Sequence, residues 1–402
     1  MNKHRIVLQT GLLIAALALL LNGSHSPAQA SKANQPAAAK PVQPSLDRTL
    51  APTSQSNRDF EVIQALADED LIVGKDTVAR VAGGGNVTIK VNGGACTVLF
   101  QGGQCSGSTK DESGATIVPL GRPVSSAVGK TFTISAGNRS VKRSVMAVDA
   151  KLDVFFLPVD WTAEMRSNPS YDYPNAIHQM TSASCDFMKA VYPVPPDNIT
   201  CNSTDVPYML RPFEEAVADA NGEINWTAIS AMYAGVGVAG RRYEPNATAV
   251  VGVLPPGWFA KHMNSANTLG LELQNVKGAV TSMITPHFLN YQVAAHEIGH
   301  TFGLLDDYNF GISPPRNGWI IDSDGFWLNK PAAVKTPHYY AVDDTSSQLG
   351  GYISFMGAAG APIWVDKCTY EYLRDAISSG KEPTQYDCAN SPGPDAKSAD
   401  AR

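Results

Sequence analysis

The sequence lacks several features that mark large classes of protein. Its 402 residues contain no basic run with interleaved aromatic residues, and the formal net charge is −6. Nucleic acid is therefore not an expected partner. Beyond the N-terminal region no stretch approaches the ~18 consecutive apolar residues of a membrane-spanning helix. There is no internal repeat, and the length suits two domains with sizeable cores.

The first thirty residues have the order of segments typical of a secretory signal peptide. Lys3 and Arg5 form a basic start, residues 11–21 (GLLIAALALLL) are apolar, and an A-x-A pattern ends at Ala30. Signal peptides are cleaved after such small residues, and the apolar run is short for a bilayer. We expect residues 1–30 to be a signal peptide and the mature protein to be secreted, extracellular or periplasmic, without a stable membrane anchor.

Cysteine is scarce, and none of the six cysteines has the C-x-x-C spacing of a metal site. No cysteine lies near the cleavage site or anywhere in residues 31–58, which excludes lipid attachment there and a thiolate that holds a metal latent. Disulfides persist in oxidising compartments. We expect three sequence-local pairs, Cys96–Cys105, Cys185–Cys201 and Cys368–Cys388.

Segments of different composition follow the expected signal peptide. Residues 31–58 are rich in Ala, Pro, Ser and Gln and lack aromatics, which is typical of a flexible linker or a pro-segment. Residues 59–149 alternate short strand-like runs with glycine-rich turns, which predicts a small β-sandwich. Within them LIVGKDTVARV, at 71–81, resembles the first strand of immunoglobulin-like modules. Residues 150–390 form the second expected domain, and 391–402 a disordered tail.

The second domain alternates strand and helix patterns, which favours an α/β fold. Buried strands are nearly continuous apolar runs, and a glycine commonly follows a helix. On these criteria we expect buried strands at 152–161 and 247–254, and helices within 176–192, 213–235 (broken near Asn221) and 288–304.

Residues 296–300 read HEIGH. His296 and His300 are four residues apart and so share one face of a helix. Two such imidazoles can bind one Zn²⁺ ion at about 2.0–2.1 Å each. Glu297 points to the neighbouring face, where it can hold a water molecule rather than the metal. The alternative is that both histidines are ordinary helix residues.

The pattern continues beyond His300. Gly303 can end the helix, and Asp306 follows it, so that the full string is H-E-x-x-H-x-x-G-x-x-D. This resembles the metzincin signature, with aspartate where most metzincins carry a third histidine and snapalysin-like enzymes carry aspartate. The continuation through Tyr308 also resembles the bacterial IgA-peptidase-like and immune inhibitor A-like secreted metallopeptidases. Asp306 is the third ligand that the resemblance implies, and Asp307 is the alternative.

A second element of the same resemblance lies downstream. S-F-M-G at 354–357 is similar to the tight turn that places a methionine, here Met356, beneath the metal of metzincins. Ordinary core packing is the alternative for this residue. Ala358 stands where such turns carry a tyrosine. Candidates for a transition-state stabiliser, by proximity in sequence, are Tyr308, His338 and Tyr339.

A weaker pattern, D-S-D-G at 322–325, resembles the start of a calcium loop but lacks the glutamate at the twelfth position. An exposed turn is the preferred interpretation, with Ca²⁺ as a minor alternative.

Together these resemblances imply an α/β zincin, metzincin-like, catalytic domain with a twisted mixed sheet and an active-site helix, preceded by a small immunoglobulin-like β-sandwich. The implied function is a secreted zinc endopeptidase with Zn²⁺ as cofactor, Glu297 as general base and a protein or glycoprotein substrate. The alternative is an exported adhesin or binding protein that retains a structural metal site. The sequence does not indicate an oligomeric state.

Overall fold

The computed structural model divides into two compact units, Met1–Gln55 and Ser56–Arg402, and all described residues belong to the second. The predicted signal peptide (1–30), linker or pro-segment (31–58) and tail (391–402) lie outside the described residues. The described residues are 59–66, 69–83, 85–110, 114–210, 217, 225–263, 270–272, 280–284, 291–305, 318–322, 338–342, 353–356, 363–365, 367–379 and 386.

Two β-sheets form the N-terminal part of this unit. The first is antiparallel with the order β1-β3-β9-β6, and β8 pairs with β9; the second has the order β2-β11-β10-β4-β5, and β7 pairs with β4. In the second sheet β2 and β11 run parallel. The strands are β1 (Phe60–Ile63), β2 (Leu71–Ile72), β3 (Thr77–Val81), β4 (Val87–Val91), β5 (Gly94–Ala95), β6 (Phe100–Gly102), β7 (Ser106–Gly107), β8 (Thr109–Lys110), β9 (Thr116–Pro123), β10 (Thr131–Ala136) and β11 (Arg139–Met146).

The two sheets share one hydrophobic core. Along β4 the side chains alternate, so that Ile89 is buried whereas its neighbour Lys90 is exposed, as the two-residue repeat of a strand requires. The same core joins Val118 of the first sheet to Ile89 and Ile134 of the second. Two sheets packed on one core form a two-layer β structure. An immunoglobulin-like topology for this part stays a prediction.

A five-stranded sheet, called here the α/β sheet, forms the centre of the C-terminal part. Its order is β13-β12-β14-β16-β15, with β15 antiparallel to β16 and the other neighbouring strands parallel. The strands are β12 (Leu152–Pro158), β13 (Ile199–Ser203), β14 (Ala249–Val253), β15 (Gly270–Glu272) and β16 (Val280–Ile284). A metzincin-type fold for this part stays a prediction.

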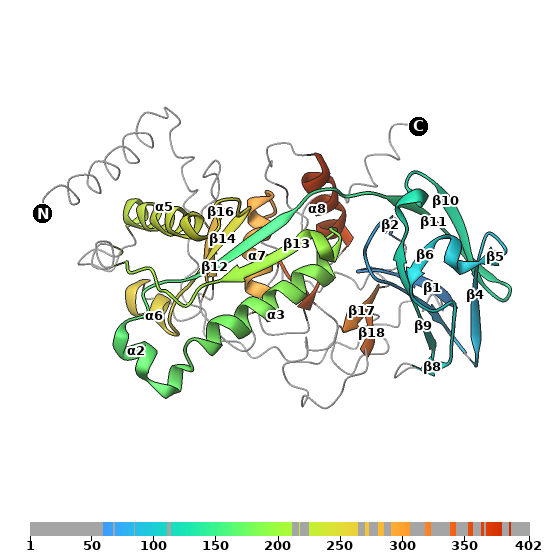
Figure 1. The fold of residues 1–402 in the computed structure, drawn as a ribbon, viewed down its shortest axis with the longest axis horizontal. Helices are drawn as coiled ribbons and strands as arrows, with labels where there is room; N and C mark the ends of the chain where they lie inside the picture. The colour runs from blue at the N-terminus through green and yellow to red at the C-terminus, as the bar shows by residue number, and fades with distance from the viewer. Residues whose placement is uncertain are drawn as a thin grey trace, which may run out of the picture. The chain divides into compact units, whose positions relative to one another are not determined.

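Helices cover both faces of the α/β sheet (Figure 1). Phe156 of β12 packs in a core with residues of α3 and α7, whereas its neighbour Phe155 packs with residues of α5 and α6. Burial on both faces explains why this strand is apolar almost throughout. The α-helices are α2 (Ala163–Ser167), α3 (Asn175–Val191), α5 (Trp226–Tyr243), α6 (Trp258–Met263), α7 (Tyr291–Thr301) and α8 (Lys367–Ser379).

The strands expected at 152–161 and 247–254 and the helices expected at 176–192 and 288–304 are confirmed by β12, β14, α3 and α7. Of the helical segment expected within 213–235, the described part is α5, which begins at Trp226 and continues beyond the expected range to Tyr243; the predicted break near Asn221 lies outside the described residues. Near its end this helix packs closely on the sheet, since a Cβ atom added to Gly240 would lie 2.4 Å from Cγ1 of Val250 in β14. The glycine therefore allows a close approach of helix and sheet.

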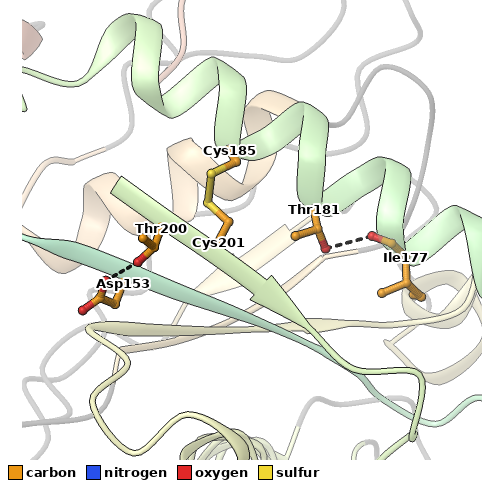
Figure 2. Close-up of a disulfide and its surroundings, with 6 residues drawn as sticks. All are labelled: Asp153, Ile177, Thr181, Cys185, Thr200 and Cys201. Atoms are coloured by element: carbon orange, nitrogen blue, oxygen red, sulfur yellow. Dashed lines mark hydrogen bonds between the residues drawn. A yellow bond between two sulfur atoms is a disulfide. The ribbon is translucent and has the colours of Figure 1, made fainter. Parts of the chain in front are cut away.

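Each part of the unit contains a disulfide bond. The predicted pairs Cys96–Cys105 and Cys185–Cys201 are confirmed. Figure 2 shows the second of them joining α3 to β13 of the α/β sheet. Beside it Thr200 donates a hydrogen bond to the Asp153 carboxylate, and Thr181 donates to the Ile177 carbonyl oxygen at 2.8 Å (Figure 2). Cys368 in α8 is disulfide-bonded and buried, and Cys388 lies outside the described residues.

Two short strand pairs complete the described structure. β17 (Gly318–Asp322) pairs with β18 (His338–Val342) in antiparallel fashion, and β19 (Ile353–Ser354) pairs with β20 (Ile363–Trp364) in parallel. None of the helices in the described part of the chain is long and apolar enough to cross a membrane.

Candidate metal centre

Helix α7 carries His296, Glu297 and His300, and its packing fixes the direction in which they point. Ala294, Ala295 and Ile298 are fully buried in the core that α7 shares with α3 and the α/β sheet. This anchoring leaves the two histidines on an adjoining face of the helix, where their ring centroids lie 4.6 Å apart and their planes are nearly perpendicular.

The Nδ1 atom of each histidine ring has a backbone carbonyl oxygen as its partner. Nδ1 of His296 lies 2.8 Å from the carbonyl oxygen of Phe355, and Nδ1 of His300 lies 2.7 Å from that of Leu304. A carbonyl oxygen only accepts hydrogen bonds, so each Nδ1 must carry the hydrogen atom. In the neutral rings the lone pair is consequently on Nε2.

The two Nε2 atoms face each other at 3.0 Å. Two lone pairs so close repel, and the arrangement requires a proton or a cation between the rings. Two nitrogen ligands at about 2.0–2.1 Å from one tetrahedral zinc ion would be ~3.3 Å apart. The donor types, their tautomers and their separation therefore fit a divalent metal ion.

The end of α7 supplies the partner of His300. The N–H group of Leu304 donates to the carbonyl oxygen of Gly299, and the N–H group of Gly303 donates to the backbone carbonyl oxygen of His300. These two bonds form the Schellman pattern of a helix C-terminus. Gly303 adopts the positive φ of 94° that this ending needs. The prediction that Gly303 ends the helix is confirmed, and the turn brings the Leu304 carbonyl back to the His300 ring.

Phe355 and Met356 of the predicted methionine turn lie directly against α7, and Gly357 lies outside the described residues. Met356 is buried, and a Cβ atom added to Gly299 would lie 2.5 Å from its Sδ atom. The preceding residue, Phe355, provides the carbonyl oxygen for His296. Met356 thus packs beneath the segment between the two histidines, and the glycine in HEIGH provides the space for it.

Glu297 lies on the face of α7 that is directed toward the edge strand β15. It is 4% exposed, and a Cβ atom added to Gly270 would lie 2.3 Å from its Oε1 atom. Gly270 therefore leaves room for the carboxyl group. Sequence reasoning missed this glycine, because the contact joins segments that are distant in the chain and no local motif marks it.

The remaining predicted site residues are placed only in part. Asp306, Asp307 and Tyr308 lie outside the described residues. The strand β18 contains His338 and Tyr339, opposite Asp322 and Ile321 of β17, and the rest of the predicted calcium loop lies outside the described residues. Within the described ranges no group of three His, Cys, Asp or Glu side chains could hold a metal ion.

A second histidine-centred cluster lies on α3, apart from this centre. Nε2 of His178 is 3.0 Å from Asp205, and its Nδ1 is 3.4 Å from the Ser203 hydroxyl. Both His178 and Asp205 are more than half exposed. Ion pairs so open to solvent contribute little, and this cluster is best explained as surface structure.

No protein-family model matches this sequence, and no curated protein matches it.

Proposed function

We propose that this protein is a secreted zinc-dependent endopeptidase, in which His296 and His300 bind the metal and Glu297 acts as the general base. The observation that carries the proposal is the pair of Nε2 atoms facing each other at 3.0 Å while both Nδ1 atoms are held by carbonyl oxygens. Backbone hydrogen bonds of this kind orient histidine ligands and set their tautomers.

The metal and the chain's own residues have separate roles in the proposed reaction. When bound, zinc supplies a Lewis acid that polarises a scissile carbonyl group and lowers the pKa of a water molecule. Glu297 accepts a proton from the attacking water and returns it to the leaving amine. Asp306 remains our proposed third ligand, with Asp307 as the alternative.

The placement of Glu297 favours catalysis over a purely structural metal site. A structural zinc site has four protein ligands and needs no general base. Here the residue next to His296 carries a buried carboxyl group, and Gly270 leaves the space that this group occupies. The adhesin or binding-protein alternative gives no reason for that arrangement.

Metal content and proteolysis, measured side by side, test the proposal. Wild-type protein should bind about one zinc ion per chain and cleave an unfolded protein such as denatured casein. Glu297→Gln should retain the zinc and lose cleavage by at least about 10²-fold, because it removes the base while keeping the shape of the side chain. Zinc binding without cleavage by the wild type would favour the binding-protein alternative, and a wild type that binds no zinc would refute the metal centre.

Two further variants identify the third ligand. Asp306→Ala should lose zinc affinity while Asp307→Ala retains it; the reverse result would assign the ligand to Asp307.

A further inference from the structure

Tyr192 lies just beyond the last residue of α3 and is fully buried. Its hydroxyl group donates a hydrogen bond to the carbonyl oxygen of Ala295 at 2.8 Å. Ala295 directly precedes His296 in α7. The phenol therefore holds the backbone of the helix at the residue before the first proposed ligand.

The ring of Tyr192 touches the other segment that orients this ligand. It stacks on the ring of Phe355, with centroids 5.8 Å apart and an angle of 25° between the planes. Phe355 is the residue whose carbonyl oxygen accepts from Nδ1 of His296. One side chain thus bonds to the backbone beside His296 and stacks on the side chain of the residue whose carbonyl oxygen accepts from the His296 ring.

Tyr192 is itself held by a residue of the N-terminal β-sheets. Lys75, in the turn after β2, is 2% exposed, and its Nζ atom donates at 2.8 Å to the carbonyl oxygens of both Lys189 and Tyr192. The last carbonyl groups of a helix have no partner within it, so Lys75 satisfies the end of α3. A buried amine is costly unless it is hydrogen-bonded, and these two bonds account for it.

Two further contacts join the N-terminal sheets to the segment that follows α3. A Cβ atom added to Gly74 would lie 3.3 Å from Cβ of Pro195. Near it Arg122 forms an ion pair with Asp197 at 2.7 Å. The N-terminal sheets are therefore joined to α3 by a packed surface, from which Lys75 reaches the residue that supports α7.

We infer that Tyr192 is a positioning residue for His296 and that Lys75 acts through it, so that the N-terminal β-sheets support the metal centre. This inference rests on the proposed function, since it assigns the support of the same site. It gives the N-terminal part a role other than substrate recognition.

Zinc and cobalt affinities test the inference with a readout that does not depend on substrate. Tyr192→Phe removes the hydroxyl group and keeps the ring. We expect it to weaken zinc binding by roughly tenfold, as is typical for residues that support metal ligands, and to shift the visible absorption bands of the cobalt-loaded protein. Tyr173→Phe is the matched control, because it also removes a phenol-to-carbonyl hydrogen bond, but one to Asp205, which belongs neither to α7 nor to the segment that contacts His296; it should leave both readouts unchanged.

A double-mutant cycle tests the role of Lys75. Lys75→Met should weaken zinc binding in the wild-type background and have little further effect in Tyr192→Phe. Asp197→Asn, which breaks an ion pair of the same surface without touching Tyr192, should not change zinc binding. Additive effects of Lys75→Met and Tyr192→Phe would show that Lys75 does not act through the tyrosine.

The outcomes separate the two proposals. If wild-type protein binds zinc and Tyr192→Phe has the same affinity and the same cobalt spectrum, the inference is wrong and the proposed function stands. If wild-type protein binds no zinc, both are wrong.

Discussion

At the scale of single residues, the space beside the Glu297 carboxyl group is set by Gly270. A methyl group at this position would lie 2.3 Å from Oε1 of Glu297 and 2.6 Å from Cγ1 of Val293. The helix is anchored in the core, so the carboxyl group would have to move. We predict that Gly270→Ala lowers kcat by about 10- to 100-fold, because a displacement of about 1 Å in a reacting group has effects of this size, with zinc content unchanged.

The measurement is steady-state cleavage together with metal analysis. Gly94→Ala in β5 is a suitable control, since its added methyl group would be 3.6 Å from the nearest atom, the carbonyl oxygen of Val91. Unchanged kcat in Gly270→Ala, or loss of zinc in proportion to loss of activity, would contradict the prediction that Gly270 acts by leaving space for the Glu297 carboxyl group.

At the scale of elements, the C-terminal turn of α7 links the end of the helix to His300, one of the two proposed metal ligands. Gly303 holds a positive φ of 94°, and the turn that it makes brings the Leu304 carbonyl to Nδ1 of His300. A left-handed conformation is unfavourable by about 1–2 kcal/mol for a residue with a Cβ atom. Gly303→Ala should therefore lower the free energy of unfolding by about that amount and weaken zinc binding. Chemical denaturation and zinc titration would measure the two effects.

Gly303→Asn distinguishes conformation from side-chain size. Asparagine adopts the left-handed conformation more readily than alanine, so this variant should lose less stability than Gly303→Ala although its side chain is larger. An equal or greater loss in Gly303→Asn would show that steric contact, and not the backbone angle, selects glycine here.

At the scale of the whole molecule, the buried Lys75 makes stability depend on pH. Burial lowers the pKa of Lys75 to about 7, and the neighbouring Asp76 opposes this shift. An unfolded lysine has a pKa of about 10.4. Between pH 7 and roughly 10 the Lys75 side chain binds a proton in the unfolded chain but not in the folded one, so its contribution to stability rises with pH in this window.

We predict that the free energy of unfolding of wild-type protein, relative to Lys75→Met, increases between about pH 7 and pH 10 by up to about 1.4 kcal/mol per pH unit. Denaturation of both proteins across this range measures the difference in their free energies of unfolding. Subtracting one from the other removes the contributions of the other titrating groups. Parallel pH profiles of the two proteins would be incompatible with a lowered pKa.

The helical part of the candidate site and several buried elements could be predicted from sequence because local geometry decides them. A spacing of four residues puts His296 and His300 on one helix face wherever the helix lies. A glycine after the helix predicts its end, and the continuous apolar run around Phe156 predicts a strand buried on both sides. Fold family, the third ligand and the domain boundaries stay predictions.

Contacts between distant segments were decided by the tertiary structure. The room that Gly270 leaves for Glu297, the bond from His296 to the Phe355 carbonyl, and the link from Lys75 through Tyr192 all join residues far apart in the chain. The close packing of α5 on β14 belongs with them, because Gly240 leaves the space for Val250. Sequence by itself determined that His296 and His300 share one face of a helix. Their tautomers, spacing and support depend on packing between elements, which no local pattern encodes.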